Sequence, residues 1–152
     1  MPSGRGCSVK FNDALQRLLQ EMELALEDLK RLRGDITSVS ELEKDSIRLR
    51  ALRDAAFVAI QSAIDVGARI ISQMGWPKPE VYRQIFYILR EKGVIPSDVG
   101  EKMMDLAAFR NVLVHLYWRL QMERLFRFLK EDYRYISEFR RAILEFIQRH
   151  EI

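Results

Sequence analysis

Residues 49–70 of this chain read LRALRDAAFVAIQSAIDVGARI. Their apolar positions recur at alternating steps of three and four, namely Leu49, Leu52, Ala56, Ala59, Ala63, Val66 and Ile70. This spacing places them on one face of an α-helix, in the pattern of a left-handed antiparallel packing. Several of them are alanines, whose small side chains let a partner helix come close. The stretch therefore predicts a long helix that packs tightly against another helix.

The sequence on either side of this helix continues the helical pattern. Apolar residues step by three and four over residues 11–29, and Gly34 follows where a helix end favours glycine. The segment 75–79, GWPKP, predicts a stop, because proline lacks an N–H and disfavours a helical conformation in the residue before it. A third helix is expected over residues 81–93, closed by Gly93.

The C-terminal half predicts further helices. Ser97 and Asp98 follow Pro96 and supply an N-cap and a first-turn acid for a fourth helix. From Gln121 a helical pattern continues to the C-terminus, with a break expected near Tyr133. The strict alternation of a strand occurs nowhere in the sequence. The predicted fold is all-α, an antiparallel up-and-down four-helix bundle with an additional short C-terminal helix.

Size and composition indicate one folded domain. The 152 residues are 48% hydrophobic and 31% charged, so we expect residues 1–152 to form a single domain, with residues 1–9 as a loose arm. The net charge of +3 permits RNA binding without arguing for it. Cys7 is the single cysteine, and we identify no signal peptide and no stretch near the roughly 20 apolar residues of a membrane span. We therefore expect a cytoplasmic protein with no structural zinc site and no membrane partner.

Four residues near the end of the fourth predicted helix are the candidates for a functional site: Arg110, Asn111, His115 and Tyr117, in the segment RNVLVHLY. The other histidine, His150, is third from the C-terminus, where fraying disfavours a well-formed site. On a continuous helix, Arg110 and Tyr117 would lie nearly in line, and Asn111 and His115 on an adjacent face. The four side chains are therefore expected to border one cleft.

An arginine and a histidine without metal ligands suit one reaction, the attack of a ribose 2′-hydroxyl on the adjacent phosphodiester. The guanidinium stabilises charge on the phosphoryl oxygens, and a histidine near its reference pKa of about 6.5 moves the proton. The leaving oxygen also needs an acid, yet each chain offers one usable histidine. A two-fold homodimer would supply the pair.

The segment from Arg110 to Tyr117 resembles the motif of HepT toxins, which is arginine, four residues, histidine, any residue and tyrosine. These toxins belong to the wider HEPN superfamily. From about Ala51 to Phe146 the resemblance also includes, in order, Ala63-Ile64-Asp65, Gly75-Trp76-Pro77, Gly93-Val94-Ile95-Pro96, Trp118, Leu129-Lys130-Glu131-Asp132 and Glu138-Phe139. Residues 1–50 resemble the family only as a long amphipathic helix and a loop.

The resemblance implies a HEPN core that dimerises across the motif, with Arg110 and His115 as the catalytic pair and Asn111 helping to place them. It implies the toxin of a type II toxin–antitoxin system, an endoribonuclease with no metal or cofactor. The partner would be a minimal nucleotidyltransferase (MNT) antitoxin that transfers AMP to the motif tyrosine, here Tyr117. The added phosphate would put negative charge beside Arg110 and fill the cleft.

Two other interpretations stay open. In the first, the chain is a non-catalytic helical partner that supplies a nucleotide-binding surface to such a nucleotidyltransferase. In the second, it is a purely structural dimerisation bundle. Histidine on a helix is more often a packing residue than a catalyst, and arginine is more often a surface group. Asp65 could anchor Arg110 or His115 from a neighbouring helix, but a solvent-facing role fits it equally, so Asp65 stays outside the catalytic set. Leu120 and Gln121 replace the acidic cap of many relatives, which leaves the break after the fourth helix open.

Overall fold

The computed structural model describes residues 2–115 and 119–150, with the backbone alone for residues 2–11. Its elements, in chain order, are α1 (Pro2–Asp35), α2 (Val39–Lys44), α3 (Ser46–Gln73), α4 (Tyr82–Glu91), α5 (Ser97–Val112), α6 (Arg119–Arg127), the π-helical turn η1 (Phe128–Asp132) and α7 (Arg134–Arg149). No strand occurs in the described part of the chain. The prediction of an all-α bundle is confirmed.

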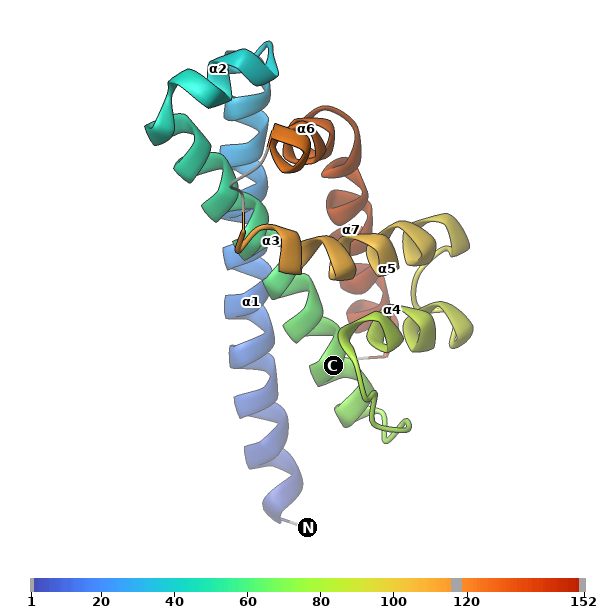
Figure 1. Ribbon diagram of the computed structural model, residues 1–152. Helices are drawn as coiled ribbons and strands as arrows, with labels where there is room; N and C mark the ends of the chain where they lie inside the picture. The colour runs from blue at the N-terminus through green and yellow to red at the C-terminus, as the bar shows by residue number, and fades with distance from the viewer. Residues whose placement is uncertain (1, 116–118, 151–152) are drawn as a thin grey trace.

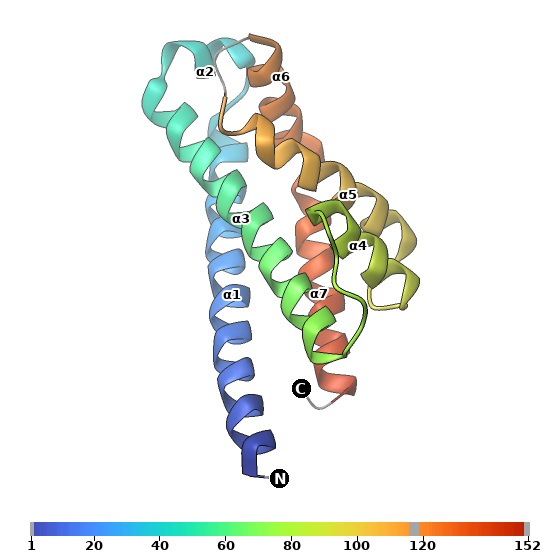
Figure 2. The ribbon, with the colours of Figure 1, turned by 60° about the horizontal axis from the view of Figure 1, so that its bottom comes forward.

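The long helices α1 and α3 lie antiparallel and side by side, as Figures 1 and 2 show. The helix α7 packs on α1, α3 and α5. The helices α4 and α5 form a pair on the side of α3 that faces away from α1. Every predicted apolar position of α3 from Leu52 to Ile70 is completely buried, as the spacing requires. The C-terminal helix, expected to be a short addition, is the 16-residue α7 and is part of the bundle.

The contact between α3 and α4 depends on Gly67. A Cβ atom at this position would lie 2.5 Å from Cγ2 of Ile85 and 3.1 Å from Cδ1 of Leu89. Any larger residue would push α4 away from α3, because a buried interface of this density has no room for an added methyl group. Tyr82 is the first residue of α4, so this close approach also sets the distance of Tyr82 from α3.

The N-terminal third differs from expectation in two places. Residues 2–9, expected as a loose arm, continue α1, in which each added residue contributes one more backbone hydrogen bond. The short helix α2 occupies the predicted loop. In α2, Glu41 N–H donates to Ser38 Oγ at 3.3 Å, and the Glu41 carboxylate accepts from Thr37. The hydrogen bonds from the Thr37 hydroxyl and backbone N–H lower the pKa of the Glu41 carboxyl.

The helix α3 is also long and apolar enough, by length and composition, to cross a membrane. This differs from the expectation that no stretch approaches such a span. The physical reason lies in the packing, since 61% of its most apolar window is buried inside the fold. A helix at the centre of a bundle is apolar on several faces because several neighbours cover it.

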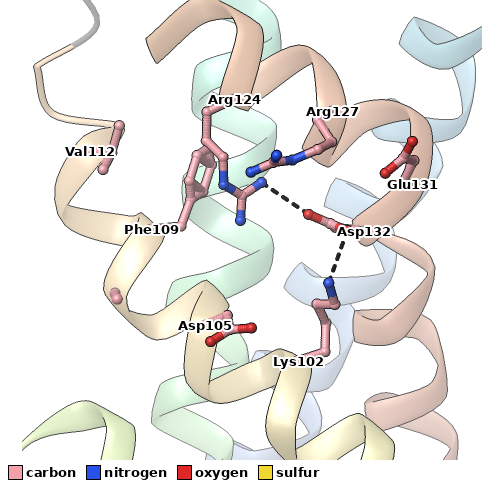
Figure 3. A pocket seen from close by; sticks show the side chains of 9 residues that line it. Lys102, Asp105, Phe109, Val112, Arg124, Arg127, Glu131 and Asp132 are labelled. Carbon is pink, nitrogen blue, oxygen red and sulfur yellow. Dashed lines mark hydrogen bonds and ion pairs between the residues drawn. The ribbon is translucent and has the colours of Figure 1, made fainter. Parts of the chain in front are cut away.

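The break predicted near Tyr133 is confirmed, and it takes the form of a π-helical turn. Tyr133 N–H donates to the Phe128 carbonyl at 3.0 Å, and the wider turn brings the Asp132 side chain inward. Asp132 is only 4% exposed and accepts from Lys102 at 3.3 Å and from Arg124 at 2.9 Å. Figure 3 shows this cluster bridging α5 to α6 and η1.

Arg124 extends the same cluster to the end of α5. Its guanidinium carbon lies 4.3 Å from the centre of the Phe109 ring. The Phe109 ring also stacks on that of Phe128, with 5.6 Å between the two ring centres. A cation held over an aromatic face in this way is stabilised by the charge distribution of the ring. Phe109 directly precedes Arg110, so these contacts anchor the backbone that carries the predicted site.

Candidate functional site

The predicted site residues lie at the end of α5, where the helix stops earlier than expected. The helix ends at Val112, Leu113 caps it, and His115 N–H donates to the Val112 carbonyl at 3.0 Å in the turn that follows. Two β-branched residues, Val112 and Val114, flank the buried Leu113, and such residues lose side-chain freedom in a helix. The expectation of one continuous helix from Arg110 to Tyr117 is wrong.

This ending changes the geometry of the motif. Arg110 and Asn111 are in the last turn of α5, whereas the exposed His115 follows in the turn, outside the helix. Tyr117 lies outside the described residues. Helical spacing therefore does not place His115 on a face with Asn111, and the relation of these residues depends instead on how the chain turns after Val112.

Arg110 is the most constrained of the predicted residues. Its guanidinium carbon lies 5.0 Å from the ring centre of Phe57 on α3 and 5.2 Å from that of Tyr82 on α4. Its Nε donates to Gln61 Oε1, and its Nη1 donates to Asn111 Oδ1 at 3.4 Å. Three helices thus hold one half-buried cation. A guanidinium has more N–H donors than these two bonds use, so it can also bind an anion.

Gln61 is a site residue that the sequence did not reveal. Its Nε2 donates to Asp65 Oδ1 at 2.9 Å, one turn further along α3. The one available signal was a pair of polar residues four positions apart on an otherwise apolar helix. The idea that Asp65 anchors Arg110 is supported only indirectly, because Gln61 lies between the two in the hydrogen-bonded chain.

A surface cavity of about 390 Å³ adjoins this cluster. It is lined by Glu80, Val81, Tyr82, Arg83, Ala107, Ala108 and Asn111. Two of these residues, Tyr82 and Asn111, contact the Arg110 guanidinium directly. The cavity therefore offers a ligand access to the immediate surroundings of Arg110. Among the residues that the structure describes, no three His, Cys, Asp or Glu side chains are grouped to hold a metal ion.

This chain is similar to known proteins both in sequence and in fold. The family model described as Ribonuclease HepT-like matches residues 22–143. A protein of Archaeoglobus fulgidus, whose name marks it as a candidate RNase, is 26% identical over 136 residues, which are 90% of this chain and 92% of that protein.

The fold likeness extends over most of the chain. The tri-AMPylated HEPN toxin of Shewanella oneidensis, solved in complex with MNT antitoxin, superposes with a TM-score of 0.77 at 16% identity, covering 88% of this chain and 98% of that one. A cytosolic protein of unknown function from Bacillus subtilis gives a TM-score of 0.67 at 21% identity, covering 86% and 91%. Because the family match covers most of the sequence and the helices follow the HEPN arrangement, this chain belongs to the HepT-like ribonuclease family.

Proposed function

We propose that this chain is the toxin of a toxin–antitoxin pair and acts as a metal-independent endoribonuclease. The observation that carries the proposal is the Arg110 guanidinium, which rests against two aromatic rings and is bonded to Gln61 and Asn111. An arginine so restrained has little orientational freedom left to lose when it binds a phosphate, which favours transition-state stabilisation. The exposed His115 follows within the next five residues. The family membership supports the same activity.

The proposed reaction needs only groups of the protein and the RNA. His115 accepts the proton of a ribose 2′-hydroxyl, whose oxygen forms a bond to the adjacent phosphorus. Arg110 binds the phosphoryl oxygens as their negative charge increases. The bond from phosphorus to the 5′-oxygen then breaks, and a protonated histidine gives that oxygen its proton. The products are a 2′,3′-cyclic phosphate and a free 5′-hydroxyl.

We further propose that the active unit is a homodimer, because the reaction needs a base and an acid. The second histidine of the chain is His150, near the end of α7. Its ring centre lies 4.2 Å from that of Phe146, and it is not part of the cluster around Arg110. Val114, which lies within the motif, and Leu120, three residues after it, are 52% and 76% exposed. Apolar side chains at this level of exposure supply surface for a second copy of α5.

The activity is tested with purified protein and a single-stranded RNA in the presence of EDTA. We expect cleavage with 2′,3′-cyclic phosphate ends and none of the all-deoxy oligonucleotide, because DNA lacks the attacking hydroxyl. In an oligonucleotide with a single ribose, cleavage is expected only after that nucleotide. Replacement of His115 by alanine is expected to remove the activity, and His150→Ala is the matched control. Cleavage of the all-deoxy oligonucleotide would contradict the mechanism.

Tyr117 is proposed as the acceptor of AMP from an MNT antitoxin. Incubation with a cognate nucleotidyltransferase and ATP is expected to add AMP, measured by intact mass, and to stop RNA cleavage, since the added phosphate would bring negative charge close to Arg110. The Tyr117→Phe protein should stay unmodified. Tyr82→Phe is the control, because Tyr82 is exposed and also adjacent to Arg110. An undiminished adduct on Tyr117→Phe would show that the acceptor lies elsewhere.

A further inference from the structure

The hydrogen-bond acceptor for Arg110 Nε is a side-chain amide, whose two ends differ chemically. Gln61 presents its oxygen Oε1 to Arg110 and its nitrogen Nε2 to Asp65. If the amide turned by half a rotation, an N–H donor would face the guanidinium, which also has only donors. The orientation of the amide therefore decides whether Gln61 supports Arg110 or repels it.

We propose that Gln61, oriented by Asp65, is a positioning residue that fixes the rotation of the Arg110 guanidinium in the ribonuclease reaction. This inference rests on the proposed function. An ionised carboxylate accepts hydrogen bonds and has none to donate, so Asp65 Oδ1, 2.9 Å from Gln61 Nε2, selects one of the two amide orientations. The selected orientation directs Oε1 to Arg110.

The aromatic contacts do not fix this rotation by themselves. Phe57 and Tyr82 lie 5.0 and 5.2 Å from the guanidinium carbon, and attraction to a ring face limits where the flat group lies. A cation can still turn over a ring with little loss of attraction. The directional bond from Nε to Gln61 removes this remaining freedom, so the other N–H groups point in set directions.

A neutral acceptor has a further advantage over a carboxylate at the same place. A glutamate at position 61 would form an ion pair with Arg110 and cancel much of the positive charge that a phosphate needs. The amide gives direction without that cancellation. The negative charge of Asp65 is one side chain further away, with Gln61 between it and Arg110.

Four variants separate these effects. Asp65→Asn keeps an oxygen that accepts from Gln61, whereas Asp65→Leu and Gln61→Leu remove an acceptor, and Gln61→Glu keeps the acceptor but adds charge. For each variant, kcat and KM for RNA are measured, together with the ¹H–¹⁵N resonance of Arg110 Nε, identified by its absence in Arg110→Lys. Thermal unfolding of each variant shows that it is folded.

We expect Asp65→Asn to fall between the wild-type protein and Asp65→Leu in kcat and in the Arg110 resonance, because its amide can present an oxygen to Gln61 Nε2 but can also present a nitrogen. Asp65→Leu and Gln61→Leu should lower kcat by about ten- to a hundredfold, more than they change KM, and should shift or broaden the resonance. Gln61→Glu should keep the resonance yet lower kcat. An Asp65→Leu protein with native kcat and resonance overturns the proposal, as does an Asp65→Asn protein that loses as much as Asp65→Leu.

The resonance distinguishes this inference from the proposed function, because it needs no RNA. If the wild-type protein cleaves no RNA, the ribonuclease proposal fails. The response of the Arg110 signal to Asp65→Leu, compared with Asp65→Asn, still shows whether Asp65 orients Gln61. An unchanged signal in Asp65→Leu overturns the positioning role independently of any activity.

Discussion

Replacement of Arg110 by alanine is expected to lower the kcat of RNA cleavage by at least about a hundredfold. The guanidinium is the one cation in the described part of the chain that bonds to both Gln61 and Asn111 while lying over two aromatic rings. Arg110→Lys is expected to lose nearly as much. A lysine keeps the charge but has no planar fork with which to bond both partners and a phosphate.

Arg69→Ala is the matched control for this prediction, because Arg69 is an exposed arginine on the neighbouring helix α3. Its kcat should equal that of the wild-type protein. Both proteins are compared at saturating RNA, after their circular dichroism spectra have shown equal helix content. If a folded Arg110→Ala protein cleaved RNA at the wild-type rate, Arg110 would have no role in the reaction.

The second large effect is expected at Asp132, outside the segment from Arg110 to Tyr117. Asp132→Ala should lower the free energy of unfolding by about 3 kcal/mol, because it leaves two partly buried cations without their shared carboxylate. The value lies at the low end for a broken buried ion pair, since the side chains of Lys102 and Arg124 are 31% and 23% exposed and can partly reach water. Urea unfolding measures the change.

The adjacent Glu131→Ala is the control for Asp132. Glu131 is an exposed residue in the same π-helical turn, and its replacement should change the free energy of unfolding by no more than about 0.5 kcal/mol. Asp132→Asn should fall between the two, because an amide can still accept a hydrogen bond from one of the cations. Equal unfolding free energies for Asp132→Ala and Glu131→Ala would show that the buried position of Asp132 carries no special weight.

These two predictions concern the two sides of one helix. On one side of α5, Arg110 reaches toward α3 and α4; on the other, Phe109 contacts Arg124, which bonds to Asp132. The ion-pair cluster in Figure 3 therefore supports the end of α5 through Phe109, on the side of the helix away from Arg110. Weakening it is expected to disturb Arg110 through the backbone.

The amino-acid pattern alone was sufficient for the helical class, the buried face of α3 and the family. Periodic apolar residues reflect a local property, since each helix displays its own buried face in its own sequence. The same is true of the residue types from Arg110 to Tyr117, on which the family resemblance rests. The catalytic roles of Arg110 and His115, and the role of Tyr117 as acceptor, stay predictions.

Where α5 ends, and what holds Arg110, could be known only from the folded chain. Leu113 would fit a longer helix by spacing, yet α5 ends at Val112, and His115 N–H donates to the Val112 carbonyl in the turn that follows. The hydrogen bond between Arg110 and Gln61 joins residues that are 49 positions apart in the sequence, and that between Lys102 and Asp132 joins residues 30 positions apart. Such pairs depend on how whole helices pack against one another, and no local pattern in either partner encodes that arrangement.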